Sequence, residues 1–330
     1  MKTKMNVLSL FDGMSCGQIA LNRLGIKYKN YYASEIDKYT IQVAQANYPD
    51  TIQLGSIEFI TKEMFGENKI DLIIGGSPCQ GFSLAGLQLN FKDPRSLLFF
   101  EFVRLIKELK PKYFMLENVK MKKDYENIIT EYMEVEPIEI NSALVSAQNR
   151  KRLYWTNIPN IIQPNDKGIL LKDVLEEMAL CGALRGRSFD KDGNKTNWKD
   201  GEHKQVLEVR EDGKTNSLTS VTKDNLVVKN ESMNSKGKAY SLTASQGNCV
   251  AWNSIERKQR TMVPVCETDD TDPNIYNGVY YRKLTPVECE RLQTVPDNYT
   301  DHVSKTQRYK MLGNGWTVDV ICHILKNLPL

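Results

Sequence analysis

Short apolar runs alternate with helical stretches over the first half of the chain. The clearest predicted strands are residues 7–11, 31–34, 71–75 and 113–116. Residues 96–109 are apolar over most of a helical surface, so we expect this helix to be buried between a sheet and its loops. The alternation over residues 1–160 is typical of a mainly parallel α/β sheet with crossover helices.

The composition changes near Asn165, where Gly, Asn, Lys, Asp and Ser become frequent. Short β-prone pieces at residues 205–209, 225–228 and 247–252 predict a separate, loop-rich β module. Its two Ser-Leu-Thr segments are too brief to indicate a repeat. After Tyr281, residues 285–293 and 317–328 predict two helices, the first with proline in its first turn.

The chain length of 330 residues exceeds what one compact core usually holds, so we expect a large domain with a smaller one attached. We find no signal peptide and no apolar run long enough to cross a bilayer, which favours a cytoplasmic protein. The seven cysteines form no Cys-x-x-Cys pair and the three histidines are far apart in sequence. This pattern disfavours disulfides, a metal site and histidine catalysis, and leaves the thiols as candidate nucleophiles.

Positive charge is concentrated in the middle of the chain. Residues 181–260 contain 15 Lys/Arg and 10 Asp/Glu, an excess of +5, which leaves −2 for the rest of a chain with net charge +3. A polyanionic partner is compatible with this excess, although a solvated lysine-rich surface is its commoner cause.

A glycine-containing loop, residues 11–17 (FDGMSCG), follows the first predicted strand and precedes a helix. Such a loop allows a close backbone approach and suits a nucleoside cofactor, although it lacks the Gly-x-Gly-x-x-Gly fingerprint. Glu35 ends the next predicted strand, where a carboxylate can accept hydrogen bonds from ribose hydroxyls. The alternatives are a structural turn and a surface glutamate.

A cysteine follows the third predicted strand. Cys79 comes after Pro78 in a glycine-rich polar loop, where a thiol is exposed and usable, whereas most free cysteines are core residues. Glu117 and Asn118 follow the fourth strand, so the Glu117 carboxyl should emerge beside the Cys79 loop if the two strands are neighbours. A helix-capping pair explains Glu117-Asn118 equally well in isolation.

Two arginines are spaced so that both side chains point to one face of an extended strand. Arg150 and Arg152 lie in residues 148–152 (QNRKR) and can grip a carboxylate or phosphate. A solvated basic strand is the usual meaning of this spacing.

Taken in order, these segments resemble the cytosine carbon-5 DNA methyltransferases of prokaryotic or phage type. Six separated motifs agree over residues 5–160 and 282–328: Phe-x-Gly-x-x-x-Gly, Pro-Cys-Gln, Glu117-Asn118-Val119, Gln148-x-Arg150-x-Arg152, residues 282–293 and Gly313-Asn314-Gly315. The resemblance implies a doubly wound, S-adenosylmethionine-dependent (Rossmann-like) α/β sheet of mixed strand direction. It further implies a catalytic domain at residues 1–164, a target-recognition domain at 165–281 and a returning C-terminal segment at 282–330.

The resemblance also assigns roles to residues. Catalysis falls to Cys79, Glu117, Arg150 and Arg152. S-adenosylmethionine, with S-adenosylhomocysteine as product, would be bound by Phe11, Asp12, Gly13, Ser15, Gly17, Glu35, Ile36, Ser56, Ile57, Pro78, Leu98, Asn314 and Trp316. DNA would contact Gln80, Ser83, Arg95 and residues within 165–281 that are not individually assignable.

Three departures from the family pattern concern the cofactor site. Ser56 stands where an aspartate near the adenine is common, Gly315 replaces a frequent serine, and Trp316 resembles the animal de novo enzymes. The adenine contacts therefore rest on apolar Ile36, Ile57 and Leu98.

The implied partner is double-stranded DNA, and no membrane association is implied. We expect a monomer associated with the nucleoid. A cognate restriction endonuclease, the recognised sequence and the base that removes the carbon-5 proton are left open. Methylation of RNA, a non-catalytic DNA-binding role and a nicotinamide oxidoreductase are the alternatives; the last lacks its dinucleotide fingerprint.

Overall fold

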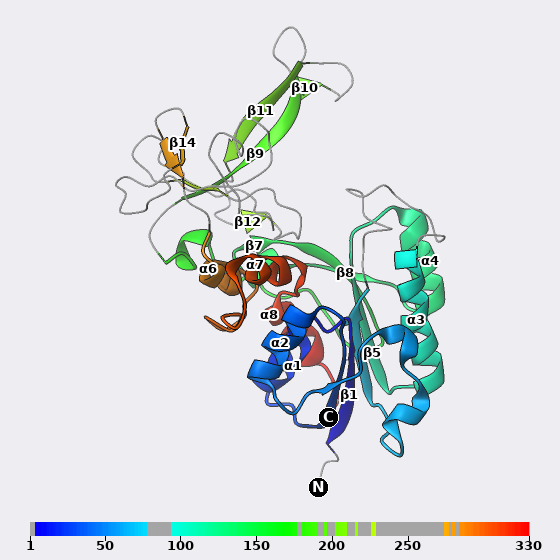
Figure 1. Cartoon of the computed structure of the whole chain (residues 1–330). Helices are drawn as coiled ribbons and strands as arrows, with labels where there is room; N and C mark the ends of the chain where they lie inside the picture. The colour runs from blue at the N-terminus through cyan, green and yellow to red at the C-terminus, as the bar shows by residue number, and fades with distance from the viewer. Residues whose placement is uncertain are drawn as a thin grey trace. The chain divides into compact units, whose positions relative to one another are not determined.

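A computed structural model of the chain describes residues 4–77, 94–176, 180–189, 195–196, 202–209, 215–216, 226–228, 274–276, 279–281 and 284–329. The chain divides into two compact units (Figure 1). The first unit comprises Met1–Asn141, Lys151–Pro164 and Trp316–Leu330, and the second comprises Ser142–Arg150 and Asn165–Gly315.

The first unit is built on a seven-stranded sheet of order β3-β2-β1-β4-β5-β8-β6. Neighbouring strands are parallel from β3 to β5, whereas β8 runs antiparallel to both β5 and β6. The strands are β1 (Met5–Leu10), β2 (Tyr28–Ser34), β3 (Ile52–Gln53), β4 (Leu72–Gly76), β5 (Tyr113–Val119), β6 (Ile138–Asn141) and β8 (Lys151–Thr156). The predicted mixed-direction sheet is therefore confirmed.

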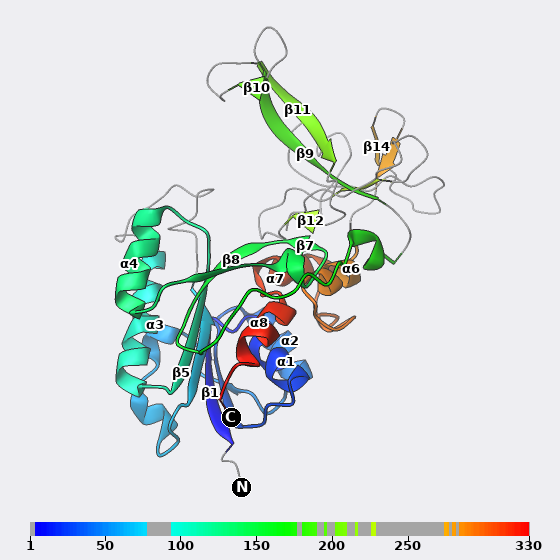
Figure 2. The same cartoon turned by 180° about the vertical axis from the view of Figure 1, so that it is seen from behind.

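Helices cover both faces of this sheet, as Figure 1 and Figure 2 show from opposite sides. One face carries α1 (Cys16–Arg23), α2 (Lys38–Asn47) and α8 (Val318–Leu325), and the other carries α3 (Pro94–Leu109) and α4 (Lys123–Met133). Because both faces are covered, all six residues of β1 are buried, as expected for a central parallel strand.

The helix predicted at residues 96–109 is observed as α3, but it is not buried all round. Phe99, Phe102 and Leu105 are fully buried in the core cluster, whereas Leu97 is 53% exposed. The outer face of α3 has no further layer over Leu97, so the apolar pattern overstated the burial of this helix.

Helix α6 (Pro286–Leu292) confirms the predicted start at Thr285-Pro286. Thr285 caps the helix and forms a reciprocal capping box with Glu288. At the other end of the chain, α8 is shorter than the predicted residues 317–328, and its N-cap is Thr317.

The second unit contains a four-stranded sheet in which β9 pairs with β10, β11 and β13. In the same unit, β7 pairs with β12 and β14 pairs with β15 in two small two-stranded sheets. The described strands of the second unit are β7 (Gln148–Asn149), β9 (Leu180–Phe189), β10 (Lys195–Thr196), β11 (Glu202–Val209), β12 (Thr215–Asn216), β13 (Leu226–Val228), β14 (Asn274–Tyr276) and β15 (Val279–Tyr281). The strands expected at residues 205–209 and 225–228 fall on β11 and β13, and residues 247–252 lie outside the described residues.

Helices α6 and α7 (Lys305–Asn314) also belong to the second unit. Ser146 and Gln148 donate hydrogen bonds to the Leu292 carbonyl at 2.6 and 3.2 Å, which ties α6 to residues 142–150. The segment expected to return to the first domain from residue 282 is therefore divided between the two units after Gly315. The three-domain division itself stays a prediction.

Among the described residues, no helix is both long enough and apolar enough to cross a membrane.

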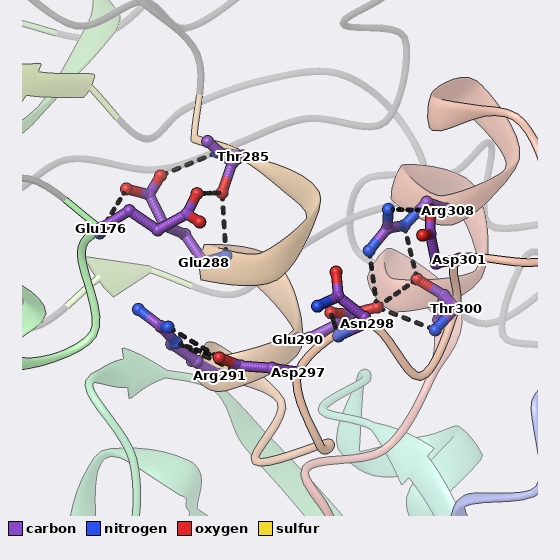
Figure 3. A network of polar contacts seen from close by, with 10 residues as sticks. All are labelled: Glu176, Thr285, Glu288, Glu290, Arg291, Asp297, Asn298, Thr300, Asp301 and Arg308. Atoms are coloured by element: carbon purple, nitrogen blue, oxygen red, sulfur yellow. Dashed lines mark hydrogen bonds and ion pairs between the residues drawn. The ribbon is translucent and has the colours of Figure 1, made fainter.

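A buried polar network fixes the segment between α6 and α7 (Figure 3). Glu290 is fully buried and accepts hydrogen bonds from the Thr300 and Asn298 backbone N–H groups at 2.8 and 2.6 Å. Arg308, itself buried, donates to the same carboxylate at 3.0 Å. Both Glu290 oxygens therefore receive donors, which compensates the burial of the charge.

Glu290→Ala should destabilise the second unit by about 3–5 kcal/mol, because two N–H groups lose their acceptor and the buried Arg308 keeps only the 63% exposed Asp301 as an ion-pair partner among the described residues. Arg291→Ala is the matched control. Its ion pair with Asp297 at 2.7 Å joins side chains that are 33% and 45% exposed, so we expect a loss below about 1 kcal/mol. Urea unfolding monitored by circular dichroism measures both, and equal losses would contradict the prediction.

Candidate active site at the carboxyl edge of the sheet

The loops that carry the predicted site residues leave one edge of the parallel sheet. Leu10 pairs with Ser34 on one side and with Gly75 on the other, and Gly76 pairs with Glu117. Because parallel strands end at the same edge, the loops after β1, β2, β4 and β5 emerge side by side.

The loop after β1 has an unusual backbone. Phe11, Gly13 and Ser15 all have left-handed conformations, with φ of 56°, 58° and 66°. Only glycine adopts this conformation without steric cost, so the two non-glycine residues indicate a constrained loop of the kind found at ligand sites. The expected strand therefore ends at Leu10, and Phe11 already belongs to the turn.

Glu35 is held by this loop and by its own turn. The Gly13 N–H donates to Glu35 Oε2 at 2.8 Å, and the N–H groups of Ile36 and Asp37 donate to Oε1 at 2.7 and 2.9 Å. The structure thus brings the glycine loop and Glu35 together, as expected. Each carboxylate oxygen has two lone pairs, so Oε2 keeps capacity for a further donor.

Asp12 is a buried residue of the same loop. The Tyr31 hydroxyl donates to Oδ1 at 2.8 Å, while Oδ2 has no hydrogen-bond partner among the described residues. Burial raises the pKa of Asp12 to about 6, with nearby hydroxyls such as that of Tyr31 offsetting part of the effect and Glu35 adding to it. Burial likewise raises the pKa of Tyr31 well above its usual value.

Gly17 is needed for helix packing. A Cβ at this position would lie 2.3 Å from Ile74 Cδ1 and 2.9 Å from the Tyr31 hydroxyl. The first turn of α1 thus packs directly on β4 and β2, so the close approach at Gly17 is to the sheet. Ser15 turns its hydroxyl to Gln18 Oε1 at 3.1 Å.

The predicted adenine contacts differ in accessibility. Ile36 is 77% exposed at the carboxyl edge. Ile57 is 3% exposed and belongs to the core cluster, against which Leu98 is also packed. Ser56 donates to Glu58 Oε2 at 3.1 Å. Among the apolar candidates, only Ile36 presents its side chain freely.

The end of β5 lies beside the end of β4. Asn118 Nδ2 donates to Ser77 Oγ at 3.0 Å, which ties β5 to the last described residue before the Pro78-Cys79 segment. Cys79 itself, Pro78, Gln80 and Ser83 lie outside the described residues, and Arg95 lies in the first turn of α3 with its side chain outside the description.

The Glu117 carboxyl receives one partner on each oxygen. Arg152 Nε on β8 is 3.0 Å from Oε1, and the Trp316 indole N–H donates to Oε2 at 3.1 Å. Glu117 is only 8% exposed, so these contacts form in a largely desolvated place. An acid, a guanidinium and an indole thus meet at the sheet edge.

Arg150 and Arg152 have separate partners. Arg150 is buried in the second unit and donates to the carbonyls of Gly313 and Gly315 at 3.3 and 3.0 Å. Its guanidinium holds the backbone around Asn314, which ends α7 and is exposed. Arg152, in contrast, contacts the Glu117 carboxylate.

Two residues of the site were missed from the sequence. Tyr31 lies within a predicted strand, and Gly76 is the second glycine of a Gly-Gly pair. Only the tertiary structure shows that Tyr31 donates a hydrogen bond to Asp12 and that Gly76 pairs with Glu117. Within the described ranges, no group of three or more His, Cys, Asp or Glu residues is arranged to hold a metal ion.

Comparison with known proteins gives one family. The family model described as C-5 cytosine-specific DNA methylase matches residues 5–329. The chain is 30% identical to the type II methyltransferase M1.ScrFI of Lactococcus lactis subsp. cremoris, covering 98% of this chain and 78% of that protein. It is 28% identical to the orphan methyltransferase M.SPRI of Bacillus phage SPR, covering 98% and 97%.

A solved structure shares the fold. The Entamoeba histolytica methyltransferase EhMeth superposes with a TM-score of 0.63 at 16% identity, covering 99% of this chain and 98% of that one. The match of the family model over nearly the whole chain, together with the relative at 30% identity, shows that the chain belongs to the C-5 cytosine-specific DNA methylases and is a DNA (cytosine-5)-methyltransferase.

Proposed function

We propose that the chain transfers a methyl group from S-adenosylmethionine to carbon 5 of a cytosine flipped out of duplex DNA, through a covalent adduct with Cys79. The observation that carries this proposal is the Glu117 carboxyl, held by Arg152 and Trp316 beside the end of β4. The Cys79 segment continues from that strand end.

The loop after β1 fits the proposed cofactor. Asp12 Oδ2 is a buried carboxylate oxygen without a partner among the described residues, suited to the ammonium group of an amino acid. Glu35 is oriented by three backbone N–H groups and keeps accepting capacity for ribose hydroxyls. Exposed Ile36 offers an apolar contact to adenine. When bound, S-adenosylmethionine supplies an electrophilic sulfonium methyl group.

Cys79 is the proposed nucleophile. It follows Ser77 by two residues, so covalent geometry restricts its Cα to about 7 Å from the Ser77 Cα. Asn118 directly follows Glu117 and donates a hydrogen bond to Ser77, the last described residue before Pro78 and Cys79. This tie between β5 and the residue before the Pro-Cys segment supports the assignment of thiol and carboxyl to one pyrimidine ring. The Arg152 guanidinium adds positive charge, which favours the reactive thiolate.

The reaction begins when the Cys79 thiolate adds to carbon 6 of cytosine, which breaks the aromaticity of the ring. Electron density then moves toward ring nitrogen 3, where Glu117 donates a hydrogen bond or proton. Carbon 5 is then methylated, with the sulfur–methyl bond broken and S-adenosylhomocysteine as the leaving group. A base removes the carbon-5 proton, the electron pair of that C–H bond restores the carbon 5–carbon 6 double bond and expels Cys79 as a thiolate, and Glu117 takes back any proton it gave to nitrogen 3.

The cytosine must leave the base stack for this chemistry, at a cost of a few kcal/mol that pocket and phosphate contacts offset. We assign phosphate or base contacts to Gln80, Ser83, Arg95 and the positively charged region within residues 165–281. Duplex DNA is therefore the proposed partner, and the enzyme is proposed to act as a monomer at the nucleoid. A filter assay of tritiated methyl transfer to duplex DNA and to tRNA distinguishes a DNA substrate from an RNA substrate.

The relatives leave the biological setting to experiment. M1.ScrFI is named a type II methyltransferase and M.SPRI an orphan one. Bisulfite sequencing of DNA from cells expressing this chain identifies the methylated sequence, and a cognate restriction endonuclease would cleave that same sequence when unmethylated.

Cys79→Ser should abolish methylation and covalent trapping on 5-fluorocytosine duplexes, because the hydroxyl is a far weaker nucleophile. Binding of S-adenosylmethionine and the circular dichroism spectrum should stay unchanged. Cys289→Ala is the matched control, since this buried thiol has its pKa raised well above the usual value by burial and is inert. Product formed by Cys79→Ser would refute the nucleophile.

Glu117→Gln should lower the single-turnover rate by about 10²–10⁴-fold with DNA affinity retained, since the amide cannot supply the proton. Glu139→Gln, which removes the carboxylate paired with Lys120 on the same sheet, should leave the rate unchanged. Rapid-quench methylation assays measure both; a near-normal rate for Glu117→Gln argues against its proton role.

Asp12→Asn should weaken S-adenosylmethionine binding and change the pH dependence of stability. The raised pKa of about 6 means that protonated Asp12 stabilises the fold below the unfolded pKa of 3.8, and this contribution is lost as pH rises through 6. The wild type should therefore lose roughly 2 kcal/mol between pH 4.5 and 7.5 relative to the variant. Urea unfolding of both proteins at both pH values tests this. The same change in unfolding free energy with pH for the wild type and the variant would contradict it.

A further inference from the structure

The Trp316 indole faces the carboxyl proposed to protonate the substrate. Its Nε1 donates to Glu117 Oε2 at 3.1 Å, and both side chains are only 8% exposed. Arg152 lies at 3.0 Å from the other oxygen. The resemblance to the methyltransferases assigns Trp316 to the cofactor, whereas this contact is to a catalytic candidate.

The strand beside the pair leaves room for it only because Gly76 has no side chain. A Cβ at Gly76 would lie 2.8 Å from Glu117 Oε2 and 2.8 Å from Trp316 Nε1. Real Cβ atoms essentially never approach other atoms this closely, so any larger residue would displace the indole or the carboxyl. The contact is therefore built from three segments: the ends of β4 and β5 and the residue before the Thr317 cap.

Trp316 is itself held in place. It directly precedes Thr317, the N-cap residue of α8, and the buried residues of this helix pack in the first unit, where the helix contacts α1. The Cys16 thiol also contacts the Trp316 carbonyl at 3.7 Å. The indole is thus presented from a fixed backbone.

We propose that Trp316 is a positioning residue for Glu117, an inference that rests on the proposed catalytic role of Glu117. The terminal torsion of a glutamate is broad, so a carboxyl held at one oxygen still rotates. The indole N–H is a donor only and binds Oε2, whereas the Arg152 guanidinium attracts Oε1 by charge, without a hydrogen bond from its Nε. Together they set the plane of the carboxyl before cytosine arrives, and a misplaced acid costs rate.

Replacement of Trp316 by 3-benzothienylalanine tests this, because this analogue keeps the two fused rings and lacks the N–H. The single-turnover methylation rate at saturating S-adenosylmethionine and DNA should fall about 10- to 100-fold, the size of effect expected when a catalytic group is misplaced. The dissociation constants of S-adenosylmethionine and duplex DNA should stay within about twofold of the wild-type values. Trp316→Phe should reproduce the rate loss.

The matched control is the same replacement at Trp155, whose indole also donates a hydrogen bond from a fully buried ring, at 2.9 Å to Thr130 on α4. That variant should keep the wild-type rate. Thermal unfolding of both variants measures how much stability each replacement costs. A purely structural role of Trp316 would lower the stability without lowering the methylation rate.

The outcomes separate the two roles. A raised S-adenosylmethionine dissociation constant with an unchanged rate at saturation would make Trp316 a cofactor contact only and overturn the proposal. An unchanged dissociation constant together with an unchanged rate would overturn it as well. In a Glu117→Gln background, the Trp316 replacement should lower the residual rate less than about twofold, because its partner is already altered; a full loss there overturns it too.

The proposed function fails separately. A near-normal rate for Glu117→Gln removes the catalytic role of Glu117 and this inference with it. A slow Glu117→Gln enzyme together with a normal Trp316 variant removes only the positioning role.

Discussion

The parallel pairing of β4 with β5 is the constraint on which the candidate site depends. Its register sets Gly76 opposite Glu117, and the Asn118 amide then binds Ser77 at 3.0 Å. The backbone hydrogen bonds of the ladder fix this register and with it the positions of the neighbouring strand residues. The acid is therefore held by the sheet itself, and the loops around it are free to differ.

Two carboxyls at the same edge are treated differently by their surroundings. Asp12 is buried with one oxygen bonded to Tyr31 and the other lacking a partner among the described residues, and burial raises its pKa to about 6. Glu117 has a donor or cation at each oxygen, from Trp316 and Arg152. Asp12 thus keeps one oxygen without a hydrogen-bond partner among the described residues, whereas both Glu117 oxygens have a hydrogen-bond or ion-pair partner, in line with the different roles proposed for the two carboxyls.

The two predicted arginines illustrate how one motif serves two purposes. Arg152 extends from β8 toward a carboxylate, whereas Arg150 holds the carbonyls of Gly313 and Gly315 in the second unit. Gln293 donates to the same Gly315 carbonyl at 3.1 Å. Five N–H donors in a rigid fork make arginine suited to both tasks, so its presence in a motif does not distinguish catalysis from backbone support.

The sequence by itself determined the α/β class, most strands of the large sheet, the start of α6 and the order of motifs that identifies the family, because these depend on periodicity, caps and local chemistry. It also placed Glu35 directly after its strand, whereas Glu117 lies within β5, which continues to Val119 instead of ending at Leu116 as expected. Tertiary structure alone decided that Leu97 is exposed, that Gly17 serves packing, and that Trp316 reaches Glu117 across 199 residues of chain. Such outcomes depend on which distant segments meet, and residue patterns along one segment contain no record of the neighbour that will cover it.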